Sequence, residues 1–297
     1  LSAADQLRSA GYKVTVDDRH DRAGGLLIYG IPNFKLEKEI VERRTKRLAD
    51  GGVVFRLGVD VGKDISLAEL RQTHNAILIA TGVYKSRELT APGTGSKGVL
   101  KALDYLIASN RVGLGVTAPE FESGLLDAKA KNVVVIGGGD TAMDCVRTAI
   151  RQGAKSVTCL YRRDRANMPG SQREVANAEE EGVRFDWLAA PRAVIEKKGG
   201  GAKAVKAHRM RLGLADASGR QSPEEIADSD YDLKADMVIK ALGFDPEDLP
   251  EHFSESKLAV NRWGGVKIDY RRMMTSIDGV FAAGDIVRGA SLVVWAI

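Results

Sequence analysis

The sequence predicts an α/β fold in which one complete βαβ unit is inserted into a second, discontinuous unit. The first observation is an uninterrupted order of strand, glycine turn, helix and strand over residues 131–161. The second is that residues 12–18 and 279–285, on either side of this insert, each contain an apolar strand that runs into acidic residues. We therefore expect two Rossmann-like domains, with residues 1–94 and 245–297 forming the discontinuous domain and residues 95–244 the inserted one.

The first stretch alternates helices and strands. Its expected elements are a helix at 1–10 stopped by Gly11, strands at 12–16, 52–56 and 76–80, and a charged helix at about 37–50. The run Pro92-Gly93-Thr94-Gly95 indicates the domain boundary. Because the chain opens within a helix and stops on an apolar run, we expect it to continue at both ends.

The insert has the clearest pattern. Its expected elements are strands at 132–136 and 156–161, helices at 141–152 and at about 172–181, and β-like runs at 193–196, 204–214 and 236–239. Gly199-Gly200-Gly201 lies between two of these runs, and we predict that it is a hairpin turn.

The composition excludes several classes of function. The 297 residues are 44% hydrophobic and 28% charged, and the net charge of +4 comes from basic and acidic residues that alternate, so we expect no nucleic-acid partner. The sequence contains no run of eighteen apolar residues, which a membrane-spanning helix would need. Its two cysteines are too few for an iron–sulfur cluster or a disulfide scaffold. We expect a cytoplasmic protein without a membrane segment, a metal site or a catalytic triad, whose four histidines lie on the surface.

The strongest signal is Gly137-Gly138-Gly139-Asp140-Thr141-Ala142, which directly follows a strand and directly precedes a helix. Gly137 permits the tight turn, Gly139 lets a pyrophosphate approach the backbone, and the small Ala142 lets the helix pack closely. The alternative is a tight strand–helix turn without a ligand. The context favours a dinucleotide-binding domain.

The end of the next strand indicates which nucleotide binds. NAD sites usually place an acid there, whereas this chain has Tyr161-Arg162-Arg163-Asp164-Arg165. Guanidinium groups at this place would pair with a 2′-phosphate, so the sequence favours NADP. The alternative is a solvated basic turn that Asp164 partly neutralises.

The discontinuous domain favours an adenine dinucleotide without a 2′-phosphate. Asp18 is placed to accept hydrogen bonds from a ribose diol, although such an acid is more often a surface residue. Gly284 and Asp285 form a turn that suits a flavin dinucleotide. The segment Gly289–Val294, which includes Ser291 and Leu292, is predicted to start a helix whose positive end would stabilise negative charge on the flavin ring. The alternative for this segment is a structural turn and a buried helix. No catalytic side chain is expected, because in hydride transfer the cofactors hold the reacting atoms.

Four stretches together resemble the small (β) subunits of NADPH-dependent glutamate synthases. They are Gly24–Leu27 with Tyr29–Pro32 and Phe34–Lys38, Gly137–Asp144, Tyr161–Glu174, and Phe281–Trp295. The resemblance extends over nearly the whole chain, and the run from Arg162 through Ser171 is more specific to the family than any glycine turn.

The resemblance implies an NADPH domain inserted into an FAD domain, with hydride passing from NADPH to FAD. Electrons would then cross iron–sulfur clusters to the large (α) subunit, which makes glutamate from glutamine and 2-oxoglutarate in ammonia assimilation. Residues implied around FAD are Asp18, Gly24, Gly25, Leu26, Ile31, Thr81, Gly82, Gly284 and Asp285. Residues implied around NADPH are Gly137, Gly139, Asp140, Thr141, Arg162, Arg163, Ala241, Leu242 and Gly243.

The sequence departs from the family pattern in two ways, and two rival functions remain to be distinguished. The first glycine fingerprint and the cluster cysteines would precede Leu1, so clusters are expected only there, and Asp17 stands where an apolar residue is expected. One rival is another NADPH–FAD reductase module, similar to part of dihydropyrimidine dehydrogenase or to a ferredoxin–NADP oxidoreductase. A second rival, of a different class, is a nucleotide-sensing module without turnover.

Overall fold

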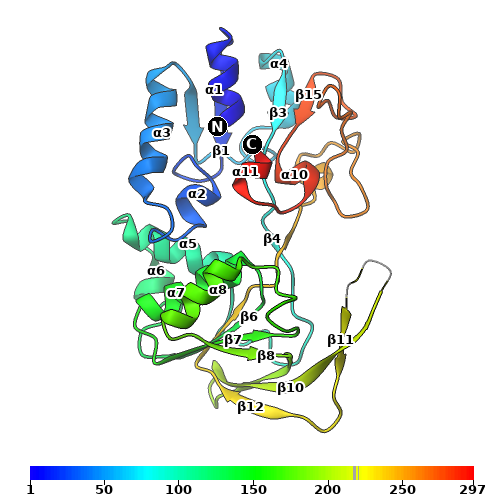
Figure 1. Ribbon diagram of the computed structural model, residues 1–297. Helices are drawn as coiled ribbons and strands as arrows, with labels where there is room; N and C mark the ends of the chain where they lie inside the picture. The colour runs from blue at the N-terminus through cyan, green and yellow to red at the C-terminus, as the bar shows by residue number, and fades with distance from the viewer. Residues whose placement is uncertain (217–218, 220) are drawn as a thin grey trace. The chain divides into compact units, whose positions relative to one another are not determined.

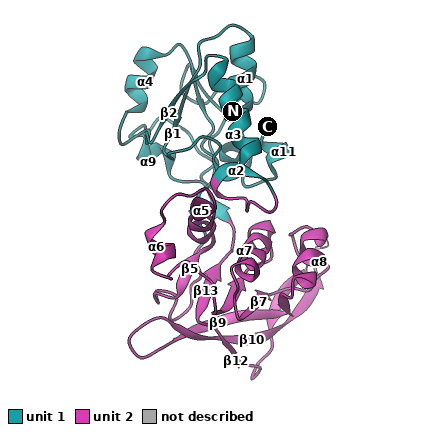
Figure 2. Ribbon diagram, turned by 90° about the vertical axis from the view of Figure 1, so that its left-hand side faces the viewer, with its two compact units in different colours: residues 1–28, 36–87, 244–297 teal, residues 29–35, 88–243 magenta. Residues whose placement is uncertain are grey.

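The computed structural model describes residues 1–216, 219 and 221–297 (Figure 1). The chain forms two compact units, drawn in teal and magenta in Figure 2. Unit 1 contains Leu1–Ile28, Leu36–Arg87 and Phe244–Ile297, and unit 2 contains Tyr29–Lys35 and Glu88–Gly243. The predicted α/β fold, with one unit inserted into a discontinuous second one, is confirmed.

Unit 2 is built on a five-stranded parallel sheet in the order β5-β13-β6-β7-β8. The strands are β5 (Val99–Lys101), β6 (Asn132–Ile136), β7 (Ser156–Tyr161), β8 (Arg184–Trp187) and β13 (Met237–Lys240). Its helices are α5 (Ala102–Gly113), α6 (Pro119–Glu122), α7 (Asp140–Arg151) and α8 (Gln172–Glu180). All five residues of β6 are buried, as expected for a central parallel strand covered on both faces.

Alternate residues of β6 pack into two different cores. Val133 and Val135 pack with apolar residues of α5, α7 and α8, which cover one face of the sheet. Val134 and Ile136 face the opposite side and pack against an antiparallel sheet. Unit 2 therefore has three layers: helices, parallel sheet and antiparallel sheet.

The antiparallel sheet comes from the segment between β8 and β13. Its strands are β9 (Ala189–Glu196), β10 (Ala202–Ala215), β11 (Gln221–Glu225) and β12 (Tyr231–Lys234), and β10 pairs with each of the others. The backbone N–H of Lys197 donates to the Gly201 carbonyl at 2.9 Å, which closes a turn between β9 and β10. The predicted hairpin turn at Gly199–Gly201 is therefore confirmed.

Unit 1 is assembled from chain segments on both sides of the insert. Its strands pair as β1 (Thr15–Asp18) with β2 (Val54–Leu57), β3 (Ile77–Ile79) with β15 (Val280–Ala282), both parallel, and β4 (Lys85–Ser86) with β14 (Phe244–Asp245), antiparallel. Its helices are α1 (Ser2–Ser9), α3 (Lys38–Asp50), α4 (Leu67–Thr73), α9 (Leu249–His252), α10 (Asp285–Arg288) and α11 (Val293–Ala296), and α2 (Leu26–Tyr29) ends where the chain enters unit 2. The pairing of β3 with β15 joins residues that are far apart in the sequence.

Two local expectations need correction or explanation. The prediction that all four histidines lie on the surface is wrong for His208, which lies within β10 and is 8% exposed; its ring is 3.8 Å from the Glu225 carboxylate of the neighbouring strand β11. Asp17 lies within β1 and not after it, and its carboxylate accepts two hydrogen bonds from Arg56 at the paired position of β2, at 2.6 and 2.7 Å. That cross-strand ion pair accounts for an acid at a position where an apolar residue was expected. No helix of the described residues is both long and apolar enough to cross a membrane.

Candidate functional site

The glycine turn of unit 2 lies where the strand order of the parallel sheet reverses. β6 is flanked by β13 on one side and β7 on the other, so the ends of all three strands meet at one edge. Gly137 has φ +146°, and a Cβ added there would lie 2.1 Å from the Ala241 carbonyl oxygen, so only glycine fits. A Cβ on Gly138 would lie 2.4 Å from the Tyr161 ring. The turn is thus held between the chain after β13 and the end of β7.

Four consecutive backbone N–H groups after this turn have no acceptor in the described part of the protein. They belong to Gly138, Gly139, Asp140 and Thr141, at the start of α7. Nothing lies within 4 Å of a Cβ added to Gly139, whereas a Cβ added to Gly170 would lie 3.6 Å from the Asp140 nitrogen. Unpaired donors at the positive end of a helix form a seat for an anion.

Two arginines at the end of β7 carry charges that no carboxylate neutralises among the described residues. Arg162 is exposed, and Arg163 is half-buried with its Nε buried and without a hydrogen-bond acceptor. Arg165, in contrast, donates from Nη1 to both oxygens of Glu179, at 3.0 and 2.8 Å. The basic cluster therefore consists of two available guanidinium groups.

Asp164 does not neutralise this pair by a direct contact. Its Oδ1 accepts hydrogen bonds from the backbone N–H and the side-chain amide of Asn167, at 2.9 and 2.8 Å. The carboxylate therefore shapes the turn after β7.

The remaining predicted NADP residues follow β13. The Ala241 N–H donates to the Ile136 carbonyl at 2.8 Å, which extends the β13–β6 pairing by one residue. Leu242 is half-buried, and Gly243 has φ +94°. The structure thus brings Ala241–Gly243, Gly137–Thr141 and Arg162–Arg163 to the ends of three adjacent strands.

Two of the predicted FAD glycines, Gly25 and Gly82, lie next to Tyr84, a residue that sequence reasoning missed. A Cβ on Gly25 would lie 3.4 Å from the Tyr84 hydroxyl, and one on Gly82 would lie 3.4 Å from the Tyr84 ring. Burial raises the pKa of Tyr84 to about 12, with the Asp18 carboxylate as the second cause. An isolated tyrosine in a loop carries no sequence signal for such a role.

Asp18 is engaged within its own loop. Its Oδ1 accepts a hydrogen bond from the His20 backbone N–H at 2.9 Å and lies 3.1 Å from the His20 ring nitrogen Nδ1. Gly24, with φ +127°, would place a Cβ 2.8 Å from Val41, and Leu26 begins α2. These residues form the first part of the predicted FAD site.

The second part lies at the ends of β3 and β15. Because these strands are parallel neighbours, Thr81-Gly82 and Gly284-Asp285 follow them at the same edge. Asp285 accepts a hydrogen bond from the Ser291 hydroxyl at 2.6 Å, and Leu292 is the N-cap of α11. Ile31, the remaining predicted FAD residue, belongs to unit 2.

Comparisons with known proteins agree with this geometry. The pyridine nucleotide-disulphide oxidoreductase family matches residues 1–297. The chain belongs to this family. It is 62% identical over 297 residues to the small chain of NADPH glutamate synthase from Azospirillum brasilense, covering 100% of this chain and 61% of that protein. It is 63% identical to a putative glutamate synthase small chain from Cereibacter sphaeroides, covering 100% of this chain and 71% of the relative.

Solved structures share the fold at low sequence identity. FprA from Mycobacterium tuberculosis in complex with NADPH superimposes with a TM-score of 0.79 at 18% identity, over 98% of this chain and 77% of FprA. Thioredoxin reductase from T. acidophilum gives a TM-score of 0.68 at 19% identity, over 99% of this chain and 89% of the reductase. These likenesses show the fold of the family. The chain spans 61% of the length of the Azospirillum relative.

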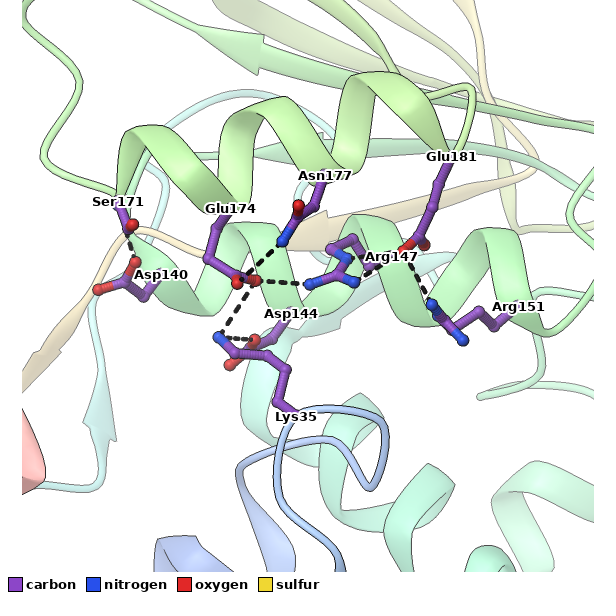
Figure 3. A network of polar contacts seen from close by, with 9 residues as sticks. All are labelled: Lys35, Asp140, Asp144, Arg147, Arg151, Ser171, Glu174, Asn177 and Glu181. Carbon is purple, nitrogen blue, oxygen red and sulfur yellow. Dashed lines mark hydrogen bonds and ion pairs between the residues drawn. The ribbon is translucent and has the colours of Figure 1, made fainter.

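In this pyridine nucleotide-disulphide oxidoreductase, helix α7, which follows the glycine turn, also carries a polar stripe that sequence reasoning missed (Figure 3). The stripe consists of Asp140, Asp144, Arg147 and Arg151, whose spacing places them on one face of the helix. Arg147 donates to Glu174 at 2.7 Å and to Glu181 at 2.7 and 3.0 Å, which ties α7 to α8. The spacing was the available signal, but a charged stripe more often faces solvent.

The segment Tyr29–Lys35, which we call the strap, is bound to this stripe. Lys35 Nζ donates to Asp144 Oδ1 at 2.7 Å and lies 3.4 Å from Glu174. Phe34 lies under the guanidinium groups of Arg147 and Arg151, at 4.7 and 4.3 Å from its ring centre. The strap therefore belongs to unit 2 although its sequence neighbours on both sides belong to unit 1.

Burial is the largest influence on the pKa of Asp144, the most buried acid of the stripe. It raises the pKa of the Asp144 carboxyl to about 6, although the charge of Lys35 opposes that shift. For Glu174, burial acts in the same direction but is outweighed by the hydrogen bond from Arg147 and the charge of Lys35, so its pKa lies below the ordinary value. The two acids that face Lys35 therefore titrate in different pH ranges.

Proposed function

We propose that this chain is the NADPH- and FAD-binding core of a glutamate synthase small chain, in which NADPH gives a hydride to FAD. The observation that carries the proposal is the pair Arg162 and Arg163, without carboxylate partners among the described residues, next to four open N–H groups at the start of α7. A diphosphate suits the helix terminus and a 2′-phosphate suits the guanidinium pair. The high identity to two glutamate synthase small chains supports the same assignment.

NADPH is the substrate of unit 2 in this proposal. Gly137 forms the tight turn, and the N–H groups of Gly139 and Thr141, which have no acceptor among the described residues, are available to the diphosphate. Arg162 and Arg163 hold the 2′-phosphate, and the turn Ala241–Gly243 borders the crevice from the neighbouring strand. The protein contributes orientation and charge here, and no side chain takes up the hydride.

The residues of unit 1 fit FAD. Gly82 and Gly284, with φ +71° and +80°, let the backbone come close to a ligand, and Asp285 follows at the same edge. Both contacts of Asp18 with His20 use Oδ1, and the second carboxylate oxygen would accept a hydrogen bond from a ribose hydroxyl. When bound, FAD supplies a ring that accepts a hydride and releases electrons singly or in pairs. Ser291 and Leu292 place the start of α11 after this turn.

In this proposal, the electron-transfer steps after FAD reduction take place outside the residues of this chain. Iron–sulfur clusters held outside this chain pass the electrons on, and a large subunit uses them to make glutamate from glutamine and 2-oxoglutarate. The relatives named as glutamate synthase small chains support this assignment. The cytoplasm is the proposed location, because the described helices include no candidate membrane span and the two cysteines are unpaired.

Exchange of the arginine pair tests the proposal. In Arg162→Ala/Arg163→Ala, the loss of two charge-assisted contacts of about 1.5–3 kcal/mol each should lower kcat/KM for NADPH by at least about a hundredfold. The value for NADH should change little. Arg165→Ala is the matched control, because Arg165 is committed to Glu179 and should leave the preference for NADPH intact. Equal losses with both nucleotides would rule out the assignment.

A further inference from the structure

We propose that Asp140 is a positioning residue for the choice of NADPH over NADH, acting through Ser171 and not through the nucleotide. The inference rests on the proposed function and assigns a specificity role to a side chain at the start of α7. Asp140 Oδ1 accepts a hydrogen bond from the Ser171 backbone N–H at 3.0 Å (Figure 3). Ser171 ends the segment 162–171, called here the arginine loop, which begins with the two guanidinium groups.

The arginine loop returns to the glycine turn at a second point. The Gly170 N–H donates to the Gly138 carbonyl at 2.9 Å, and a Cβ on Gly170 would lie 3.0 Å from the same oxygen. The Tyr161 hydroxyl donates to the Asn167 carbonyl at 3.1 Å. The loop is therefore fastened to the seat of the diphosphate at both Gly138 and Asp140, which sets the spacing between that seat and the arginine pair.

Electrostatics separate this role from direct binding. A carboxylate on the first residue of α7 stabilises the helix but repels a diphosphate bound at the same terminus. Contact with the nucleotide is therefore unfavourable for Asp140, whereas its hydrogen bond to Ser171 orders the loop that carries the 2′-phosphate ligands. NADH has no 2′-phosphate, so its binding should not depend on where the arginine loop lies.

Three variants of the full-length protein isolate the hydrogen bond from the charge. Asp140→Ala removes both, Asp140→Asn removes the charge but keeps an oxygen acceptor, and Ser171→Pro removes the N–H donor while the charge stays. Proline suits the φ of −56° at Ser171. Glu180→Ala, which removes an exposed carboxylate from α8 and leaves the Arg165–Glu179 pair in place, is the matched control.

The measurement is calorimetric binding of adenosine 2′,5′-bisphosphate and of adenosine 5′-monophosphate, which need no flavin. The ratio of the two affinities cancels the general effect of charge on the shared 5′-phosphate. We expect this ratio to fall about tenfold in Asp140→Ala and Ser171→Pro, the scale of one charge-assisted hydrogen bond. It should fall by no more than about threefold in Asp140→Asn, which keeps a neutral acceptor for Ser171, and should stay within about twofold of wild type in the control.

The outcomes separate this inference from the proposed function. A wild-type protein that binds both probes equally would overturn the proposed NADPH site itself. A wild type that prefers the bisphosphate, with the ratio preserved in Asp140→Ala or Ser171→Pro, would overturn only the role of Asp140. Equal falls of the ratio in Asp140→Ala and Asp140→Asn would assign the effect to charge and also overturn it.

Discussion

Replacement of Asp144 by asparagine should change how the stability of unit 2 depends on pH. The Asp144 side chain is 10% exposed, and burial raises its pKa from an ordinary 3.8 to about 6 despite the charge of Lys35. The neighbouring acids Glu174 and Asp140 act in the same direction as burial. Because the folded chain then holds this proton more tightly than the unfolded chain, the linked stability is fully present below pH 3.8 and is lost as the pH rises through 6.

The size of the effect follows from the same two pKa values. Over the whole range the linked free energy of unfolding is about 3 kcal/mol, and between pH 5 and pH 7.5 it is about 1.4 kcal/mol. Asparagine cannot titrate, so the stability of wild type minus that of Asp144→Asn should rise by this amount on going from pH 7.5 to pH 5. Other carboxylates cancel in the difference.

Urea denaturation of both proteins at several pH values between 5 and 7.5 measures this difference. Asp232→Asn, an exposed position on β12, corrects for the general loss of one carboxylate. Thermal scans at the same pH values provide a second probe. A difference between wild type and Asp144→Asn that is flat over this range, or that falls towards pH 5, would refute the reasoning.

Two further predictions concern the glycine turn and the cysteines. Gly137→Ala should destabilise unit 2 by on the order of 3–5 kcal/mol in urea denaturation, because its Cβ would lie 2.1 Å from the Ala241 carbonyl, whereas Gly139→Ala, with open space around it, should cost less than about 1 kcal/mol. Similar stabilities of the two variants would contradict this. Burial raises the pKa of the Cys159 thiol to about 12 and that of Cys145 well above the ordinary value, so neither should react with a thiol reagent at pH 8 until denaturant is added. Rapid labelling of the native protein would contradict the burial of the two thiols.

Features that depend on neighbouring residues were predictable from the sequence. The periodicity of residues 132–161 predicts strand, turn and helix because a buried parallel strand and an amphipathic helix have different repeat lengths. The glycine turn is local chemistry as well, since φ +146° at Gly137 excludes other residue types. The basic run after β7 likewise indicates a site for a 2′-phosphate. All of these signals lie within a few consecutive residues.

Other features required the packed structure, because they join residues that are distant in the sequence. Three arginines follow β7 in the sequence, but only the packing of α8 shows that Arg165 is committed to Glu179 while Arg162 and Arg163 are not. In the same way, the cross-strand pair of Asp17 and Arg56 arises when β1 and β2 are placed in register.

The strap is the clearest case of this second kind. Nothing in the sequence around Lys35 distinguishes it from a surface residue of unit 1, yet it binds Asp144 of α7, 109 residues later in the chain. A largely buried carboxylate such as Asp144, which is 10% exposed, is stable as an ion only where the fold supplies it with hydrogen-bond and charge partners. Residue type and spacing thus define the glycine turn and the arginine pair, while the assignment of partners to charges follows from which helices pack together.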